Sequence, residues 1–398
     1  MTDPGVLDAR GPLDPTVQER LRAISASRVT AGNRVRLLVD GVQTYTTMLD
    51  LVEQAEREIL FENFIFRADA VGIAFADALR GRAETGVDVR VLHDPFGSLM
   101  SLRAPIGFRF HRSPVRVRVY NPPRPTPAFF RRGRDHRKLV VQDRRRLVVG
   151  GMCLADVWLG NCVSMCTWRD SAALVEGEAA QEAARAFEHL WGHGRTFTPR
   201  RPSPTARPAG EPSLQPSGSV PVRLVADEPR KRRVERMLAE VFGAATSEIL
   251  ITNPYVILPE SLTKALTAAA RRGVATHLLV PRSGNHHWVG LSSEHRIGRL
   301  LAAGVKVWRW RGPLIHAKTI VVDRRWSMVG STNLDPLSLW RNAEINAEIH
   351  GSRLGEQMAD LFFRDVRSAT HFSHDDWLHR PRFRRLLTQA ATFGWSWQ

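Results

Sequence analysis

One short pattern occurs twice in this chain. It consists of a histidine, one residue, a lysine, four residues, an aspartate, six residues and a glycine. It begins at His136 in "HRKLVVQDRRRLVVG" and again 180 positions later at His316 in "HAKTIVVDRRWSMVG". The chain has 57 lysines and arginines, yet only five are lysines, and two of these five, Lys138 and Lys318, occupy the same position of the pattern. Such a repetition predicts two copies of one folding unit.

The order of predicted elements is repeated together with the pattern. Residues 47–66 and 72–94 each indicate a helix followed by a buried strand, and residues 232–258 and 261–281 repeat that order. In the first segment, Met48, Leu51, Ala55 and Ile59 have helical spacing. Alternating helices and strands favour largely parallel sheets that are covered by helices on both faces. The sequence therefore predicts an α/β fold made of two similar lobes.

A proline-rich segment separates the two predicted lobes. Residues 198–221 contain seven prolines and almost no apolar side chains, so they cannot pack a core and indicate a linker. We therefore expect one domain over 1–197, with the first motif, and a second over 222–398, with the second motif. At 398 residues the chain is long enough for two domains of ordinary size.

Charge and composition restrict the class of partner. A 43% hydrophobic and 24% charged chain is typical of a globular protein. Its formal net charge of +17 indicates attraction to an anion, which leaves nucleic acid, an acidic lipid surface and a phosphorylated substrate open. No run of 18 apolar residues occurs, so we expect contact with a membrane surface at most. The three cysteines, Cys153, Cys162 and Cys166, have neither a disulfide pattern nor metal-ligand spacing with histidine.

The repeated motif has the residue types that phosphoryl transfer needs. Each copy lies on a β-like run, where residues i and i+2 point to the same face, so His136 projects with Lys138 and His316 with Lys318. Two imidazoles beside two ammonium groups suit a phosphodiester bound between them. The lysines would neutralise phosphoryl oxygens as compact charges, where the wider arginine fork would fill the space of the phosphorus. The histidines would make the bond and transfer protons.

The two motifs, followed by "GGMC" and "GSTNLD", resemble the phospholipase D superfamily. Over residues 33–390, apart from the linker, segments such as "LFENFIFRADAVGIAFADAL" and "GSTNLDPLSLWRNAEIN" resemble bacterial cardiolipin synthases of the short form, which lack N-terminal membrane helices. This resemblance implies two α/β/α sandwich lobes with the active site at their interface. It also implies one histidine that forms a phosphohistidine and one that acts as general acid. We expect these to be His136 and His316, and the reverse assignment stays open.

The resemblance also implies roles for the residues around the histidines. An acidic residue downstream of each motif holds the other nitrogen of the histidine, and Asp170 and Glu344 fit that place. The two motif aspartates are Asp143 and Asp323. The family pattern groups them with the catalytic residues, but we expect them to brace the structure of the motif.

Four residues after the motif strands correspond to the family's phosphate-binding positions. Ser331 and Asn333 match the pattern of the second motif, and Gly151 and Cys153 occupy the same positions of the first. Cys153 stands where the family usually has asparagine. Because a thiol is a weak donor, one substrate or loop contact is expected to be missing there.

The function that the resemblance implies is a phosphatidyltransferase that makes cardiolipin from phosphatidylglycerol or a related donor. Hydrolysis to phosphatidic acid is the nearest alternative, followed by a nuclease of the same superfamily and a binding protein with a decayed site. We expect a phospholipid substrate, an anionic membrane surface as partner, no nucleic acid, and no cofactor or metal, because the lysines and amide donors supply positive charge. The oligomeric state stays open.

We expect the protein to act at the cytoplasmic face of the cell membrane and to be attached there peripherally. Aromatic and apolar side chains among the arginines could line the cleft and enter the headgroup layer, or could belong to ordinary strands and loops. They are Phe108, Phe110, Phe129, Phe130, Trp288 and Leu291.

Overall fold

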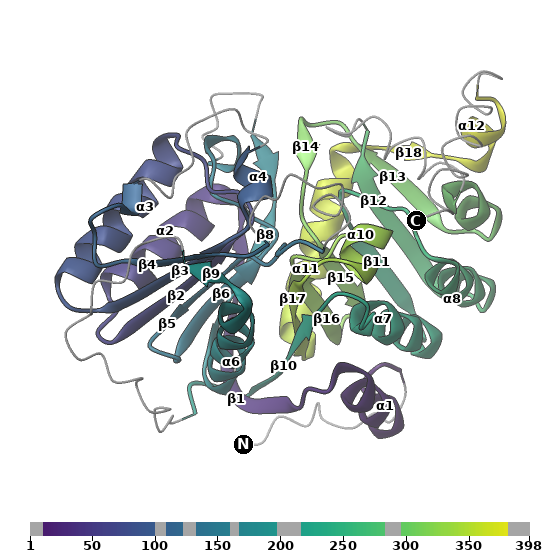
Figure 1. Ribbon diagram of the computed structural model, residues 1–398. Helices are drawn as coiled ribbons and strands as arrows, with labels where there is room; N and C mark the ends of the chain where they lie inside the picture. Colours follow the sequence, from purple (N-terminus) through teal and green to yellow (C-terminus); the bar gives the residue numbers. More distant parts are fainter. Residues whose placement is uncertain are drawn as a thin grey trace.

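The computed structural model describes residues 11–99, 109–121, 133–159, 167–196, 216–282 and 296–380. Helices and strands alternate through both halves (Figure 1). The helices are α1 Pro15–Ser25, α2 Asp40–Glu53, α3 Ala70–Glu84, α4 Pro95–Leu99, η2 Asp156–Trp158, α6 Glu178–His193, α7 Arg233–Ala244, α8 Glu260–Arg271, α10 Pro336–Trp340, α11 Ser352–Arg367 and α12 His374–Leu378.

The strands of the first half are β1 Val29–Val39, β2 Glu58–Asn63, β3 Asp88–His93, β4 Arg116–Val119, β5 Leu139–Gln142, β6 Arg146–Gly150, β7 Trp168–Arg169, β8 Ser171–Glu176 and β9 Arg195–Thr196. Those of the second half are β10 Val220–Asp227, β11 Glu248–Thr252, β12 Ala275–Pro281, β13 Lys306–Trp310, β14 Leu314–Ile315, β15 Thr319–Val322, β16 Trp326–Gly330, β17 Glu344–His350 and β18 Ala369–Phe372.

The strand order shows that the two halves are copies of one unit. From β1 outward the order is β8, β6, β5, β2, β3, β4 and β9, and from β10 outward it is β17, β16, β15, β11, β12, β13 and β18. Each strand of one series occupies the place of its counterpart in the other, and β1 pairs with β10 antiparallel at the centre. The two halves lie side by side in Figure 1. The predicted duplication into two similar α/β lobes is therefore confirmed.

The expectation of largely parallel sheets is wrong. Parallel pairing joins β2 to β3 and β3 to β4 in the first half, and β11 to β12 and β12 to β13 in the second. The short strands β7 and β14 are also parallel, whereas the other described ladders are antiparallel. The reason is the connection after each motif strand. Between β5 and β6 the chain turns back at Asp143 and Arg144, which have φ angles of 51° and 56°. Such a short turn makes a hairpin, whose strands are necessarily antiparallel.

The predicted helix–strand units are present with small differences at their ends. Gly86 and Gly273 follow α3 and α8 with φ angles of 96° and 93°, a left-handed conformation that suits glycine at a helix end. The helix expected from residue 47 ends at Glu53, so Ile59 lies in β2 instead of on the helical face.

Three apolar clusters give the molecule its layers. One lies beneath α2 and α3 of the first half, and another joins α1, α7 and α8 to the second half. The third combines residues of both halves, such as Leu139 and Phe187 with Val329 and Phe362, and contains the buried faces of α6 and α11. The halves therefore share a core at their junction, and the active site can be built there.

The domain limits of 1–197, 198–221 and 222–398 stay a prediction. Val220 and Pro221 already belong to β10, and α1 packs with α7 of the second half. Residues 198–215 lie outside the described residues, as do Cys162, Cys166, Phe108, Phe129, Phe130, Trp288 and Leu291.

Phe110 cannot serve as a membrane anchor in this structure. It is 1% exposed, and its ring packs 6.1 Å from that of Phe66 in the core of the first half. Among the helices that the structure describes, none has the length and apolar character needed to cross a bilayer.

A buried ion pair stabilises the central part of the second half. Arg223 of β10 donates to both carboxylate oxygens of Glu348 in β17, at 3.0 and 2.9 Å, and to the side chain of Gln18 in α1 at 2.9 Å. Its side chain is 2% exposed and that of Glu348 is fully buried. We expect Arg223→Met to lower the free energy of unfolding by about 3 kcal/mol, because the buried Glu348 carboxylate loses its arginine and keeps His350, whose Nε2 lies 2.7 Å from Oε1.

Urea unfolding of the purified variant measures this effect. Arg34→Met is the matched control, since Arg34 lies 3.9 Å from Glu176 with 70% of its side chain exposed, and it should cost at most about 1 kcal/mol. Equal midpoints for the two variants would show that the buried pair does not tie β10, β17 and α1 together.

Candidate active site

His136 belongs to the first half and is held by the second. Asp135 forms a parallel bridge with Ala343, and the backbone N–H of His136 donates to the Ala343 carbonyl at 3.0 Å. This places the ring against Glu344, the first residue of β17. The imidazole Nδ1 lies 2.9 Å from Oε1 of the fully buried Glu344 carboxylate.

His316 is held by the first half in the same way. The strand β14 pairs with β7, and the backbone N–H of His316 donates to the Arg169 carbonyl at 2.7 Å. Its Nδ1 lies 2.8 Å from Oδ2 of Asp170, which is also fully buried. Asp170 and Glu344 thus contact the histidines as expected, but the pairing is crossed, and each carboxylate holds the histidine of the other half.

This geometry assigns the ring protons. An ionised carboxylate can only accept hydrogen bonds, so each neutral histidine carries its proton on Nδ1 and donates it to the carboxylate. The lone pair of each ring then lies on Nε2. A nitrogen of this kind can attack phosphorus, or can carry a second proton and deliver it to a leaving group.

Both motif lysines lie against the histidines, and each is 3% exposed. Lys138 donates to the His136 carbonyl, and its ammonium lies 5.3 Å from the centre of the Phe64 ring. The Nζ of Lys318 lies 2.9 Å from Nδ1 and 3.0 Å from Nε2 of His316. Because these two distances are almost equal, the ammonium lies over the face of the imidazole instead of along either lone pair, and Nδ1 stays with Asp170.

The charges of the two halves act on one another. Burial lowers the pKa of His316 to about 3, and the ammonium groups of Lys318 and Lys138 add to this while Asp170 opposes it. Burial, followed by Lys138 and Lys318, also lowers the pKa of His136 well below its usual value. Burial lowers the pKa of Lys318 itself to about 7. Since each lysine acts on the histidine of the other motif, the two motifs form one site.

The two orienting carboxylates differ in their surroundings. Asp170 accepts from the indole Nε1 of Trp158 at 3.0 Å and from the Ser171 backbone N–H at 2.8 Å. Burial acts to raise the Asp170 pKa, but the hydrogen bond and charge of His316, with the charge of Lys318, outweigh it and hold the pKa below its usual value. At Glu344 burial prevails and raises the pKa to about 7. Asp170 is therefore the more firmly ionised of the two.

Trp158 is a site residue that sequence reasoning missed. It is 1% exposed, and its ring lies 5.4 Å from that of His316, so it positions both Asp170 and the imidazole. Trp168 also contacts this imidazole, with ring centres 5.5 Å apart. Neither tryptophan belongs to the repeated motif, and no spacing in the sequence marks them.

The four positions expected to bind phosphate have different surroundings. A Cβ on Gly151 would lie 2.7 Å from Oδ1 of Asp170 and 3.0 Å from Cδ of Lys318, so only glycine leaves both side chains in place. Cys153 is 1% exposed and packs in the apolar cluster of the first half. The Ser331 hydroxyl donates to Glu344 and accepts from the Ile345 backbone N–H at 2.9 Å, so it positions the carboxylate.

Asn333 is the remaining one of these four residues. Its side chain is buried at 6% exposure, and its Oδ1 has no protein partner among the described residues. This oxygen is a hydrogen-bond acceptor, so the described structure leaves an acceptor, and not a donor, unpaired at this position.

The motif aspartates lie away from the histidines, and their grouping with the catalytic residues is corrected. Asp143 accepts from the backbone N–H groups of residues 56, 57 and 58 at 2.9, 2.8 and 2.8 Å, and Asp323 accepts from those of residues 246, 247 and 248. Each lies beyond the far end of its motif strand, about 16 Å along the chain from the lysine at about 3.3 Å per residue. Both aspartates brace the strand turns.

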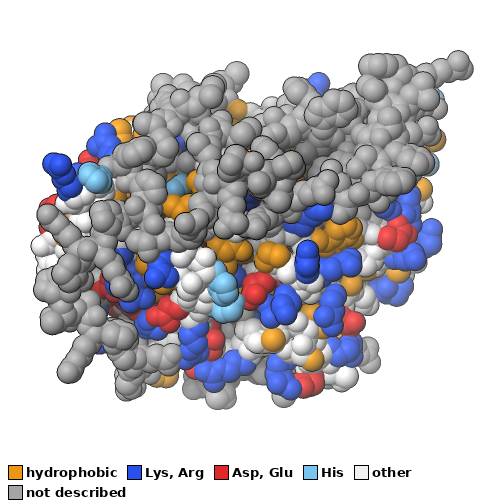
Figure 2. Space-filling model, viewed as in Figure 1, with side chains coloured by type: hydrophobic (Ala, Val, Ile, Leu, Met, Phe, Trp, Pro, Cys, Tyr) orange, Lys and Arg blue, Asp and Glu red, His pale blue; other side chains and the backbone are white. Residues whose placement is uncertain are grey.

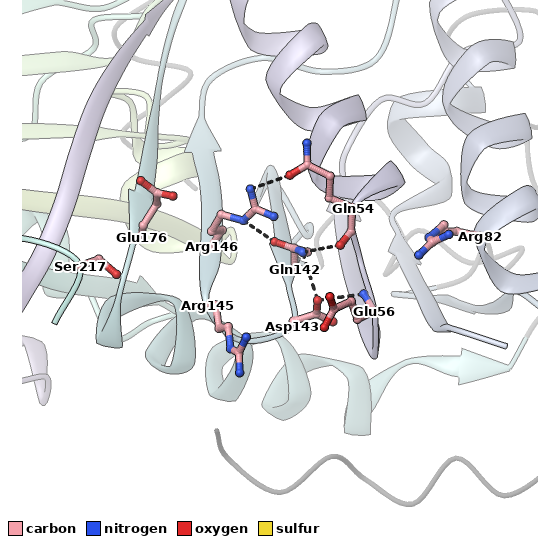
Figure 3. Close-up of a pocket in the computed structure, with 9 residues that line it drawn as sticks. All are labelled: Gln54, Glu56, Arg82, Gln142, Asp143, Arg145, Arg146, Glu176 and Ser217. Carbon is pink, nitrogen blue, oxygen red and sulfur yellow. Dashed lines mark hydrogen bonds between the residues drawn. The ribbon is translucent and has the colours of Figure 1, made fainter. Parts of the chain in front are cut away.

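A solvent-open hollow of about 640 Å³ lies at this far end, next to Asp143 (Figure 3). Its lining combines Arg82, Arg145 and Arg146 with Glu56 and Glu176, and it contains neither histidine. It is therefore separate from the site built by the two motifs.

Comparisons with known proteins place the chain in a family. Residues 238–366 match the family described as "Cardiolipin synthase, PLD-like domain". The chain is 30% identical to the major cardiolipin synthase ClsA of Bacillus subtilis (strain 168) over 370 residues, which are 91% of this chain and 75% of the relative. It is 28% identical to a cardiolipin synthase of Geobacillus kaustophilus (strain HTA426), over 96% of this chain and 76% of the relative.

Solved structures share the fold. The phosphatidylserine synthase of Haemophilus influenzae Rd KW20 superposes with a TM-score of 0.73 at 15% identity, covering 95% of this chain and 98% of that one. The polyphosphate kinase of Porphyromonas gingivalis superposes with a TM-score of 0.57 at 14% identity, over all of this chain and 57% of that one. With the relatives in sequence and the paired motifs in one site, the chain belongs to the cardiolipin synthase family of the phospholipase D superfamily.

Proposed function

We propose that this protein is a phosphatidyltransferase that makes cardiolipin from phosphatidylglycerol or a related phospholipid donor. The observation that carries the proposal is the pair of crossed contacts, His136 with Glu344 and His316 with Asp170, which leaves Nε2 of each histidine for chemistry between two lysines. The family membership supports the substrate class, since the curated relatives are named cardiolipin synthases.

In the first half-reaction, Nε2 of His136 attacks the phosphorus of the donor lipid. A phosphorus–nitrogen bond forms and the bond from phosphorus to the headgroup oxygen breaks. His316, protonated on Nε2, gives that proton to the leaving oxygen, so that glycerol departs when the donor is phosphatidylglycerol. The product is a phosphatidyl group on His136.

In the second half-reaction, His316 acts as a base. Its Nε2 accepts the proton of a hydroxyl on a second phosphatidylglycerol, whose oxygen attacks the phosphorus. The phosphorus–nitrogen bond breaks, cardiolipin forms, and both histidines return to their starting states. Water in place of this hydroxyl would give phosphatidic acid by the same steps.

The unequal carboxylates support the assignment of roles. Asp170 keeps its charge and opposes the burial and the lysine charges that lower the pKa of His316. The negative phosphodiester would raise that pKa further, so that His316 can carry the proton that the general acid requires. Glu344, with its pKa raised to about 7 by burial, stabilises an imidazolium less, which suits a neutral nucleophile at His136. The negative phosphodiester would also raise the pKa of Lys318 again and hold it charged against a phosphoryl oxygen.

We further propose that the protein reaches its substrate at an anionic membrane surface. The formal charge of +17 supports this, and on the face shown in Figure 2 lysine and arginine side chains are spread among fewer acidic ones. Basic side chains near an anionic bilayer each contribute about 1 kcal/mol of attraction.

The first prediction concerns the two histidines. We expect His136→Ala and His316→Ala each to abolish cardiolipin formation from phosphatidylglycerol liposomes, measured by separation of the lipid products. With a donor phospholipid that has no headgroup hydroxyl in place of phosphatidylglycerol, no acceptor lipid is present, and acid-labile and base-stable phosphohistidine should accumulate on His136, detected by peptide mass spectrometry. Wild-type turnover in either variant would contradict a shared site, and phosphate on His316 would reverse the assignment. Duplex and single-stranded DNA serve as substrates that should stay uncleaved.

The second prediction concerns Trp158 as a positioning residue. Trp158→Phe removes the N–H that donates to Asp170 but keeps an aromatic ring, so we expect kcat to fall about tenfold with little change in KM, because a hydrogen bond to a charged group is lost. The acidic limb of the kcat–pH profile should shift, since Asp170 sets the protonation of His316. Trp191→Phe, in a ring stack with Phe187 on α6, is the control. A change in KM alone would argue against positioning of the acid.

The third prediction concerns the membrane. Cosedimentation should be strong with phosphatidylglycerol vesicles, weak with phosphatidylcholine vesicles, and reduced as salt is raised through screening. On the sequence-based hypothesis for the cleft loops, the double change Phe129→Ser and Phe130→Ser should weaken sedimentation with anionic vesicles. Equal binding to neutral and anionic vesicles would contradict the attraction to an anionic surface. No effect of the double change would contradict a role of Phe129 and Phe130 in membrane binding.

A further inference from the structure

Asn63 is a buried amide without a protein partner. It is the last residue of β2 and is 1% exposed. Neither its Nδ2 nor its Oδ1 has a hydrogen-bond partner among the described residues. Because a buried polar group without a partner is costly, such a group calls for an explanation.

The strand register places Asn63 beside the first motif. The antiparallel ladder of β2 with β5 ends with Glu62 opposite Leu139, and Lys138 directly precedes β5, so the same register continued by one residue sets Asn63 opposite Lys138. Cross-strand neighbours point to the same face of a sheet. Phe61 and Val140, two residues away on each strand, lie in the apolar cluster that also contains Cys153, so Asn63 and Lys138 face that side.

The residue after Asn63 contacts the catalytic histidine. The ring centre of Phe64 lies 5.0 Å from that of His136 in an edge-on arrangement. The end of β2 therefore belongs to the wall of the site, and Asn63 is oriented on the same face as the motif lysine.

Its counterpart in the second half has a different environment. Asn253 occupies the same register opposite Lys318, as Thr252 pairs with Thr319. Its Nδ2 donates to the Thr332 carbonyl at 3.2 Å, and its Oδ1 accepts from the backbone N–H groups of Leu334 and Tyr255 at 3.1 and 3.2 Å. Asn253 thus fixes the loop that carries Asn333.

The corresponding loop of the first half, which carries Cys153, is held without a contact from Asn63. The backbone N–H of Leu154, the counterpart of Leu334, donates to the Ile65 carbonyl at 3.0 Å. Asn63 is therefore not needed to hold the loop. The same loop carries Cys153 where the second half has Asn333, so it lacks the amide that Asn333 provides.

We infer that the Asn63 side-chain amide donates a hydrogen bond to a phosphoryl oxygen of the substrate and supplies in the first half the donor that Cys153 lacks. This inference rests on the proposed function for the phospholipid substrate, but its chemistry requires only a phosphate group in the site. Asn63 would then be a substrate-binding residue, and the asparagine side chain in the wall of the site would stand at a different position of the chain in each half.

Asn63→Leu tests this inference, because it removes the amide and keeps the size of the side chain. We expect the affinity for inorganic phosphate, measured by isothermal titration calorimetry, to fall about tenfold, and kcat/KM for phospholipid to fall about 10- to 100-fold. The melting temperature should stay unchanged or rise, since no protein hydrogen bond is lost. Asn253→Leu is the matched control and should lower the melting temperature by several degrees, because it breaks the three contacts of Asn253.

Two further variants complete the test. Cys153→Asn should restore part of the phosphate affinity in the Asn63→Leu background. Asn63→Asp should weaken phosphate binding further than Asn63→Leu, because a carboxylate repels the anion. Unchanged phosphate affinity in Asn63→Leu, or a loss of melting temperature equal to that of Asn253→Leu, would overturn the inference. Phosphate binding is measured without turnover, so its result stands even if the wild-type protein makes no cardiolipin and the proposed function fails.

Discussion

The contact between each histidine and the carboxylate of the other half is the interaction on which the site depends. Neither half contains a complete pair, since His136 needs Glu344 and His316 needs Asp170. The backbone follows the same crossing, because β7 pairs with β14 and Asp135 bridges to Ala343. The apolar core shared by α6 and α11 holds the halves in this register. The histidine–carboxylate pairs are therefore complete only when the two lobes are packed together.

The duplication is symmetric in its strands and asymmetric in its chemistry. Between the motif histidine and lysine, the first half has Arg137 and the second has Ala317. Arg137 is 1% exposed and donates to the backbone carbonyls of Ala186, Glu344 and Asp227 at 3.0, 3.3 and 3.2 Å, so it also joins the halves. The acids differ as well, because the pKa of Asp170 is held below its usual value while burial raises that of Glu344 to about 7. One copy of the unit can therefore specialise in attack and the other in proton transfer.

The repeated spacing predicted the duplication and both histidine–lysine pairs, because such a spacing is a local signal, whereas the two orienting acids, Asp170 and Glu344, followed only from the resemblance to the family. It could not predict that the acids are exchanged between the halves, since crossing depends on how β7 and Glu344 are placed in three dimensions. The expectation of largely parallel sheets was wrong because short hairpin turns follow β5 and β15 and make the next strands antiparallel. Sequence reasoning also missed Trp158 and Asn63. The indole N–H of Trp158 donates to Asp170, and the amide of Asn63 is buried without a partner among the described residues. Neither feature produces a periodic pattern in the sequence.

The crossed pairing is the central claim, and the ring nitrogens of the histidines report it directly. Side-chain ¹H–¹⁵N correlation spectra of histidine-labelled protein can be compared for the wild type, Asp170→Asn and Glu344→Gln. The account predicts that Asp170→Asn moves the Nδ1 signal of His316 and leaves that of His136 in place, and that Glu344→Gln does the reverse. A shift of His136 on loss of Asp170, with His316 unchanged, would show pairing within each half and would contradict the account.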